Sequence, residues 1–158
     1  MILYHGSNVR ITEVDLERSE VGKDFGAGFY LTDSKEQAER MGQRKARLFG
    51  GVATVSSFEF DESAARSADL AFKEFHSYSR EWAEFVLANR ANGSRIQIHD
   101  FDIVYGPIAN DDVGYQIRRL LAGLITMDAF LKGLEFKKGI TFQYFFSTAD
   151  AVSYLKSL

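Results

Sequence analysis

A Gly-x-Gly turn stands in front of an apolar strand, and this order constrains the fold more than any other feature. The turn is Gly26-Ala27-Gly28, and residues 29–32 that follow it read Phe-Tyr-Leu-Thr. A Rossmann dinucleotide unit needs a strand before its glycines and a helix directly after them, and a P-loop needs a lysine after its last glycine. Neither pattern is present, so this motif does not predict a phosphate bound by glycines.

Strand and helix patterns follow one another irregularly along the chain. Apolar or alternating runs between turn residues predict strands at 2–5, 29–32, 52–60, 102–105 (broken at Gly106-Pro107) and 140–147. Apolar faces behind capping residues predict helices at 35–48 (capped by Asp33 or Ser34), 79–92, 113–122, 126–134 and from Thr148 through Leu155. Because this order lacks a regular βαβ rhythm, we expect an α+β fold.

Length and composition favour one domain and exclude several classes of site. The 158 residues are 46% apolar and hold a single proline and no linker-like stretch, which predicts one continuous domain over 1–158. The absence of cysteine excludes disulfides and thiol-based sites, and it is compatible with the cytoplasm, where we expect the protein. The net charge of −3 disfavours binding to a phosphate backbone, and no apolar run predicts a membrane span or signal peptide.

The N-terminal strand ends on a histidine. In Leu3-Tyr4-His5-Gly6-Ser7, the histidine is followed by a glycine, which lets another molecule approach the backbone closely. A lone histidine at a strand end is more often a structural residue that forms a hydrogen bond. A functional interpretation therefore depends on the second motif.

Together, L-Y-H-G-S at 3–7 and G-A-G-F-Y-L-T at 26–32, followed by Ser34-Lys35, resemble the two N-terminal motifs of the ADP-ribosyltransferase superfamily, in its diphtheria-toxin and poly(ADP-ribose) polymerase-like branch. The segments 82–90, 102–111 and 143–148 resemble a bacterial family of uncharacterised domains within it. The resemblance implies split antiparallel β-sheets that form an NAD-binding cleft flanked by helices. It also implies a toxin that is paired with a small antitoxin protein.

The same resemblance implies residue roles. His5 would bind the adenosine ribose, the backbone of Gly6 would grip the nicotinamide carboxamide, and the Ser7 hydroxyl would support either group. In Gly28-Phe29-Tyr30, the tyrosine would lie beside the nicotinamide, where a ring face attracts a pyridinium cation, and Gly28 would clear space for it. Met41 is the one apolar candidate for the opposite side of that ring.

The third motif departs from the usual pattern. The superfamily normally has a glutamate at the start of a late strand, and the matching residue here is Gln143. A neutral amide can form a hydrogen bond with the ribose 2′-hydroxyl, but it neither supplies a negative charge nor removes a proton. We therefore expect single transfers and no chain elongation. The less favoured alternative is that Gln143 is only a polar residue of a half-exposed strand, and Glu135 is a spare carboxylate outside the motif.

Other polar groups lie in the matching segments. Asn89-Arg90 and Asn110-Asp111-Asp112 could face the acceptor or the phosphates of NAD, and Arg90 suits a phosphate best because its planar fork binds oxyanions at two points. Helix termination and turn formation explain these residues equally well. His76 and His99 have no ligand-spaced partners, so we expect no metal.

The sequence thus predicts an NAD-dependent mono-ADP-ribosyltransferase without a metal, a bacterial toxin with His5, Tyr30 and Gln143 as its catalytic residues. Its acceptor would be an unidentified protein or nucleic acid. Two alternatives stay open. Because the glutamate is replaced, the domain could be a non-catalytic module that binds NAD or a macromolecule, or it could be an NAD glycohydrolase in which water replaces the acceptor.

Overall fold

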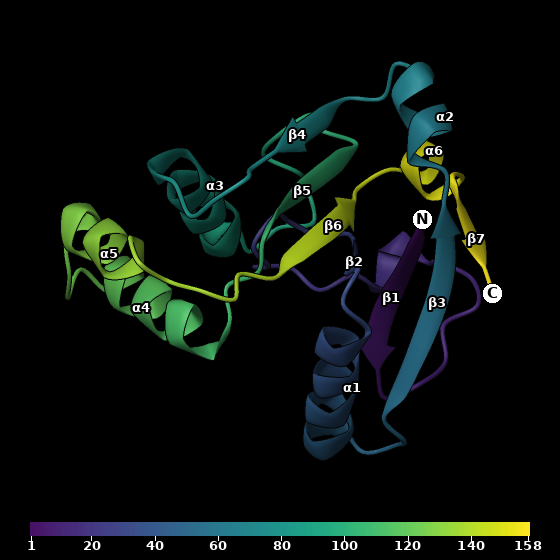
Figure 1. Ribbon diagram of the computed structural model, residues 1–158, viewed down its shortest axis with the longest axis horizontal. Helices are drawn as coiled ribbons and strands as arrows, with labels where there is room; N and C mark the ends of the chain where they lie inside the picture. Colours follow the sequence, from purple (N-terminus) through teal and green to yellow (C-terminus); the bar gives the residue numbers. More distant parts are fainter.

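Two β-sheets of unequal size form the centre of the computed structural model, which describes residues 1–158 (Figure 1). A three-stranded sheet has the order β1-β3-β7 and a four-stranded sheet the order β2-β6-β5-β4. The strands are β1 (Ile2–Ser7), β2 (Phe29–Leu31), β3 (Thr54–Phe60), β4 (Phe72–Glu74), β5 (Ile103–Pro107), β6 (Phe142–Phe146) and β7 (Leu155–Ser157). The helices are α1 (Lys35–Phe49), α2 (Glu62–Ser67), α3 (Arg80–Ala91), α4 (Asp111–Leu121), α5 (Met127–Leu134) and α6 (Ala149–Val152), with a 3₁₀ turn, η1 (Leu16–Arg18). The α+β class is confirmed.

The two sheets meet where β1 approaches the end of β2. The amide of Tyr4 donates to the carbonyl of Thr32 (2.7 Å), and the amide of Thr32 donates to the carbonyl of Tyr4 (2.9 Å). All other pairings are antiparallel except that of β4 with β5, which is parallel. The expectation of purely antiparallel sheets is wrong at this pair because α3 forms the crossover connection that a parallel pair requires.

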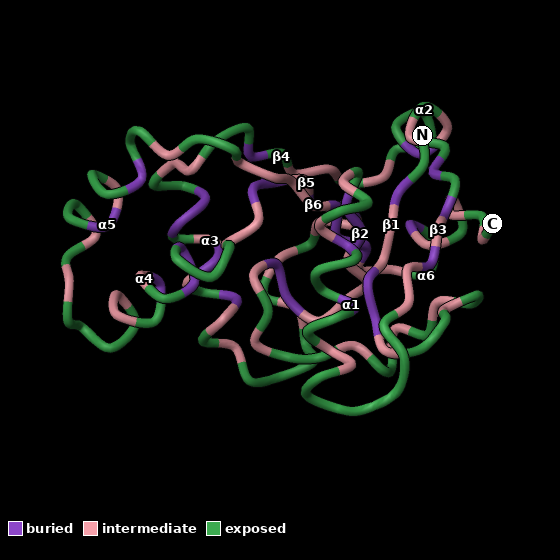
Figure 2. Tube along the Cα trace, turned by 60° about the horizontal axis from the view of Figure 1, so that its bottom comes forward, coloured by how far each residue is buried: buried purple, intermediate pink, exposed green.

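Strand β6 divides the aromatic core into two halves. Successive side chains of a strand point to opposite faces, so Phe145 lies on one face while Tyr144 and Phe146 lie on the other. Phe145 belongs to a cluster that includes Trp82 and other side chains of α3, α4 and α5. Tyr144 and Phe146 join a cluster between the two sheets that includes Leu3. Figure 2 shows buried positions along the strands, and exposed positions in the loops and along much of the helices.

Side-chain caps start α1, α3 and α6 where the sequence predicts, whereas α2, which Asp61 caps, was not predicted. The hydroxyl of Ser34 accepts a hydrogen bond from the amide of Gln37 at the start of α1, and that of Ser79 accepts from Trp82 at the start of α3. Thr148 caps α6 in the same way. These bonds satisfy amides that have no partner within a helix, which is why a Ser or Thr before an apolar run is a good start signal.

Two predicted boundaries are wrong. Strand β5 does not break at Gly106 but continues to Pro107, which is tolerated because β4 pairs only with residues 103–105 and leaves the outer side of Pro107 without a neighbour. The closing helix ends at Val152, and the chain then turns into β7, which pairs with β3. The last residues form a strand in place of the predicted helical turn because they pair with the free edge of β3.

The helical pair α4–α5 lies at the end of the molecule opposite the three-stranded sheet, and α1 packs along β1 (Figure 1). Apolar side chains of α4 and α5, among them Val113, Ile117 and Phe130, join the cluster on the Phe145 face of β6. No helix of this fold combines the length and apolar character needed to cross a membrane.

Candidate functional site

The three predicted motifs meet at the junction of the two sheets. Nδ1 of His5 on β1 lies 2.8 Å from the carbonyl oxygen of Tyr30 on β2. Tyr30 pairs with Phe145 on β6, two residues after Gln143. The side-chain amide nitrogen of Gln143 in turn lies 3.4 Å from a carboxylate oxygen of Asp24. Asp24 stands just before the glycine turn that precedes β2. The three motifs are thus linked through β1, β2 and β6, although no hydrogen bond joins His5 to Gln143 directly.

His5 is neutral in this position, where it donates a hydrogen bond through Nδ1 and can accept one through Nε2. A carbonyl oxygen only accepts, so the Nδ1 that faces Tyr30 must carry the ring proton. Burial lowers the pKa of His5, the bond to Tyr30 opposes this shift, and the charge of Lys45 adds to it. The ring stacks on Phe29, with 4.7 Å between centroids. Nε2 is thus unprotonated, and it has no partner in the chain and is not sealed from solvent.

The Tyr30 side chain closes the glycine turn. Its hydroxyl accepts from the amide of Phe25 (3.0 Å) and donates to the carbonyl of Gly26 (2.8 Å). Its ring packs against Phe145, with 5.0 Å between centroids. Burial, reinforced by the charge of Asp24, raises its pKa well above the usual value, so the phenol keeps its proton. The hydroxyl therefore stabilises the turn, and the ring packs beside Phe25 and Phe145 in the aromatic core.

The chain itself fills the space beside the two glycines that the sequence assigned to a ligand. A Cβ on Gly6 would lie 1.8 Å from the carbonyl oxygen of Ala38, and one on Gly28 would lie 2.3 Å from the ring of Phe145. Gly6 lets α1 lie directly on β1, and Gly28 lets β2 lie over Phe145. Close packing of the protein against itself thus accounts for both glycines.

The backbone conformation at position 26 requires a glycine. Its φ of +109° is strained for residues with a side chain. A Cβ added to Gly26 would lie 2.3 Å from the amide oxygen of Gln97 and 3.2 Å from that of Asn89, and both oxygens are buried without a hydrogen-bond partner. His99 contacts the same turn, and its Nε2 lies 2.8 Å from the carbonyl oxygen of Phe25.

An ion pair that the sequence did not single out lies beside Gln143. Nε of Arg90, near the end of α3, is 2.6 Å from Oδ1 of Asp24, and the two side chains are only 20% and 13% exposed. Burial and the charge of Asp24 raise the pKa of Tyr78 to about 12, which places this tyrosine near the same carboxylate. Asp24 directly precedes the apolar turn 25–28, and a lone acid in front of an apolar motif is the signal that could have found it.

The remaining candidates lie apart from this cluster. Asn110 caps α4, while Asp111 and Asp112 form ion pairs with Arg44 and Lys137, so helix capping and surface pairing account for this run. The Ser7 hydroxyl has only a long contact with Asn8, and Met41 is exposed on α1.

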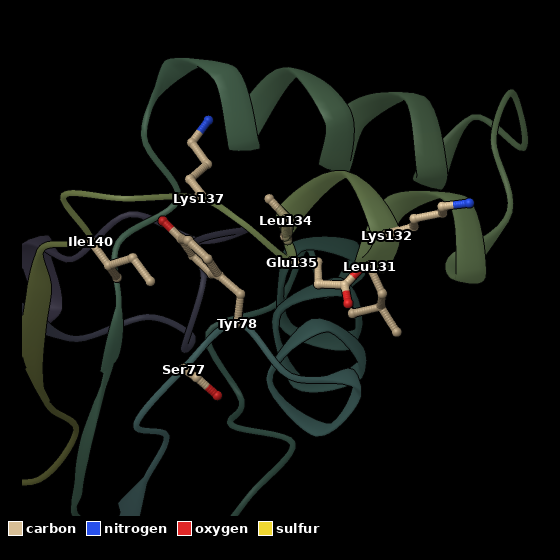
Figure 3. A pocket seen from close by; sticks show the side chains of 8 residues that line it. All are labelled: Ser77, Tyr78, Leu131, Lys132, Leu134, Glu135, Lys137 and Ile140. Carbon is tan, nitrogen blue, oxygen red and sulfur yellow. The ribbon is translucent and has the colours of Figure 1, made fainter.

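Glu135 lines a cavity of about 490 Å³ between α5 and the segment before α3 (Figure 3). Tyr78 forms part of the same wall and donates its hydroxyl to the carbonyl of Ile108 (2.8 Å). Glu135 is therefore on the α5 side of Tyr78, and no hydrogen bond joins it to Gln143.

Comparison with known proteins gives a family and no described activity. Neither the curated proteins nor the solved structures contain a match to this chain. A family described as "Protein of unknown function (DUF3990)" matches residues 1–157, which is nearly the whole sequence. The chain belongs to this family.

Proposed function

We propose that this protein is an NAD-dependent mono-ADP-ribosyltransferase. The observation that supports the proposal is the convergence of the three motifs on one junction, through the contacts of His5 with Tyr30 and of Gln143 with Asp24. An α+β fold with two sheets that meet at this junction is compatible with the split-sheet cleft that the resemblance implies.

The proposed chemistry needs few groups. Breaking the bond between nicotinamide and ribose passes through an oxocarbenium-like state, so a site must hold the ribose rigidly and favour positive charge. The free Nε2 of His5 can accept a hydrogen bond from a ribose hydroxyl. The ring of Tyr30 supplies a π-face for the nicotinamide cation. Nicotinamide leaves with the bonding electrons, a nucleophile of the acceptor forms the new bond to the ribose carbon, and the proton of that nucleophile passes to water.

Incubation with NAD⁺ labelled on the adenylate, in bacterial lysate, tests the proposal. Transfer puts label on macromolecules, and the double variant His5→Ala/Gln143→Ala should lose it, while His76→Ala, an exposed histidine outside the junction, should keep it. Free labelled ADP-ribose without labelled macromolecules would mean hydrolysis. Unchanged NAD⁺ would leave only a binding module and overturn the proposal.

We further propose that the activity is toxic to bacteria and is restrained by a small antitoxin protein. Expression of the chain alone should then slow growth, and the same double variant, soluble and folded by its melting curve, should relieve the effect. Undiminished toxicity of that variant would separate toxicity from chemistry at this junction.

A further inference from the structure

We infer that Asp24 is a positioning residue that turns the Gln143 amide so that its carbonyl oxygen faces the ribose. This inference rests on the proposed function, because it assigns a role to Gln143 within that site. Asp24 lies outside the segments that carry the three motifs. It contacts Arg90, 66 residues away in the sequence, and Gln143, 119 residues away.

The chemistry of the two side chains decides the orientation. Paired with Arg90 at 2.6 Å, Asp24 is a carboxylate, and a carboxylate only accepts hydrogen bonds. Oδ2 of Asp24 faces the Gln143 amide at 3.4 Å, which is long for a hydrogen bond. The charge of Asp24 still selects the orientation in which the Gln143 NH₂ group faces it, because the reversed amide would place the Gln143 carbonyl oxygen against a carboxylate oxygen.

The same orientation leaves the Gln143 oxygen available. Oε1 has no hydrogen-bond partner in the chain, and it is not among the side-chain atoms buried without one, so it is open to solvent. A glutamate at this position would present a carboxylate oxygen to a ribose hydroxyl, and Gln143 presents a carbonyl oxygen instead. A neighbouring carboxylate that binds the NH₂ group also polarises the amide and strengthens its oxygen as an acceptor.

Arg90 keeps Asp24 in place. Its Nε donates to Oδ1 of Asp24 and leaves Oδ2 for Gln143, and both charged side chains are mostly buried. The other titratable groups that sense this carboxylate are Tyr30 from β2 and Tyr78 from the segment before α3, and burial keeps both phenols protonated. Arg90 is thus the only cation in the cluster, and Asp24 the only anion.

A set of four purified variants tests the inference: Asp24→Asn, Gln143→Glu, the double variant Asp24→Asn/Gln143→Glu, and Asp112→Asn as a control for loss of a surface acid. Asp24→Asn should reduce nicotinamide release from NAD⁺ by about tenfold, the effect of losing one hydrogen bond to a charged group, with little change in NAD affinity. Asp112→Asn should leave release unchanged, because Asp112 is 85% exposed and pairs only with Lys137.

The decisive readout is the titration of residue 143 by carbon NMR, which needs no catalytic activity. In Gln143→Glu, the new carboxylate faces Asp24, and a like charge at this distance should raise its pKa by about one unit or more. In the double variant the raised midpoint should fall back, and the pH profile of nicotinamide release should shift to lower pH with it.

The outcomes separate two failures. Equal midpoints in the single and double variants would overturn the inference, because Asp24 would then not face residue 143. A midpoint that moves as expected in a protein that releases no nicotinamide would support the geometry and overturn the proposed function. A tenfold loss of nicotinamide release in Asp24→Asn with no change in the midpoint of residue 143, together with a lower melting temperature than that of Asp112→Asn, would overturn the inference and make Asp24 a structural residue.

Discussion

The two ends of the candidate site are held by different kinds of contact. At one end, His5 bonds the backbone carbonyl of Tyr30 and stacks on Phe29. At the other end, Gln143 contacts Asp24, which is itself held by Arg90. A group anchored to backbone tolerates changes in neighbouring side chains, whereas members of a side-chain network depend on one another.

The two ends also differ in charge. Burial keeps His5 neutral, so its end offers a hydrogen-bond acceptor without charge. The Gln143 end holds a buried carboxylate and its guanidinium partner. We therefore expect Gln143 to act mainly on the charge that develops on the ribose, and His5 to act mainly on NAD binding. The following substitutions test this division, beginning with the largest expected effect.

Gln143→Ala should reduce nicotinamide release by about 10²–10³-fold, the range for losing one positioned hydrogen bond to a charged transition state. The dissociation constant for NAD should change much less. Single-turnover release and calorimetry measure the two quantities. If the variant matches the parent in both, the Gln143 end is not where the chemistry occurs, and Glu135 is the next carboxylate to substitute.

Gly28→Ala should destabilise the fold between the two ends, because its Cβ would meet the ring of Phe145 at 2.3 Å and the carbonyl of Phe146 at 2.6 Å. Overpacking of this kind costs about 1–3 kcal/mol, or about 2–4 °C of melting temperature per kcal/mol at this size. Gly133→Ala is the matched control, since nothing lies within 4 Å of its added methyl. That exposed helical position should gain up to about 1 kcal/mol. A melting temperature of Gly28→Ala equal to that of the parent would show that the Phe145 ring can move away from the added methyl group.

His5→Ala should weaken NAD binding by about tenfold, since one hydrogen bond between neutral groups contributes about 0.5–1.5 kcal/mol. The rate at saturating NAD should fall less than in Gln143→Ala. Thermal shift gives a direct measure, because saturation at about 100 times the dissociation constant adds about 2.7 kcal/mol. A larger effect on rate than on affinity would reverse the assignment of the two ends.

The smallest effect concerns pH. Burial holds the pKa of His5 below its ordinary value of 6.5, so the unfolded chain takes up a proton first as the pH falls. Stability should therefore decrease as the pH drops below about 6.5, until the folded protein also takes up the proton. Urea unfolding at pH 7.5 and 5.5 should show a smaller decrease for His5→Gln. An identical decrease in both proteins would mean that His5 titrates alike in the folded and unfolded states.

Local signals predicted the long elements and the short β2, which follows a glycine turn, but they missed β4 and β7. Helices α1 and α3 follow from a capping serine and an apolar face, and β6 follows from its aromatic run. Strands β4 and β7 have only three residues each, which is too short for a pattern. They form because β5 and β3 offer free edges, and an edge is a property of the assembled sheet.

The sequence by itself determined the α+β class, the starts of α1, α3 and α6, and the strands that carry His5, Tyr30 and Gln143. These depend on hydrogen bonds and side-chain patterns within a few residues. Only the tertiary structure decided that Ala38 requires Gly6, that Arg90 pairs with Asp24, and that Asp24 faces Gln143. The pairing of β2 with β6 brings such distant residues together, and a shift of one residue in that register would turn Gln143 to the other face of the sheet.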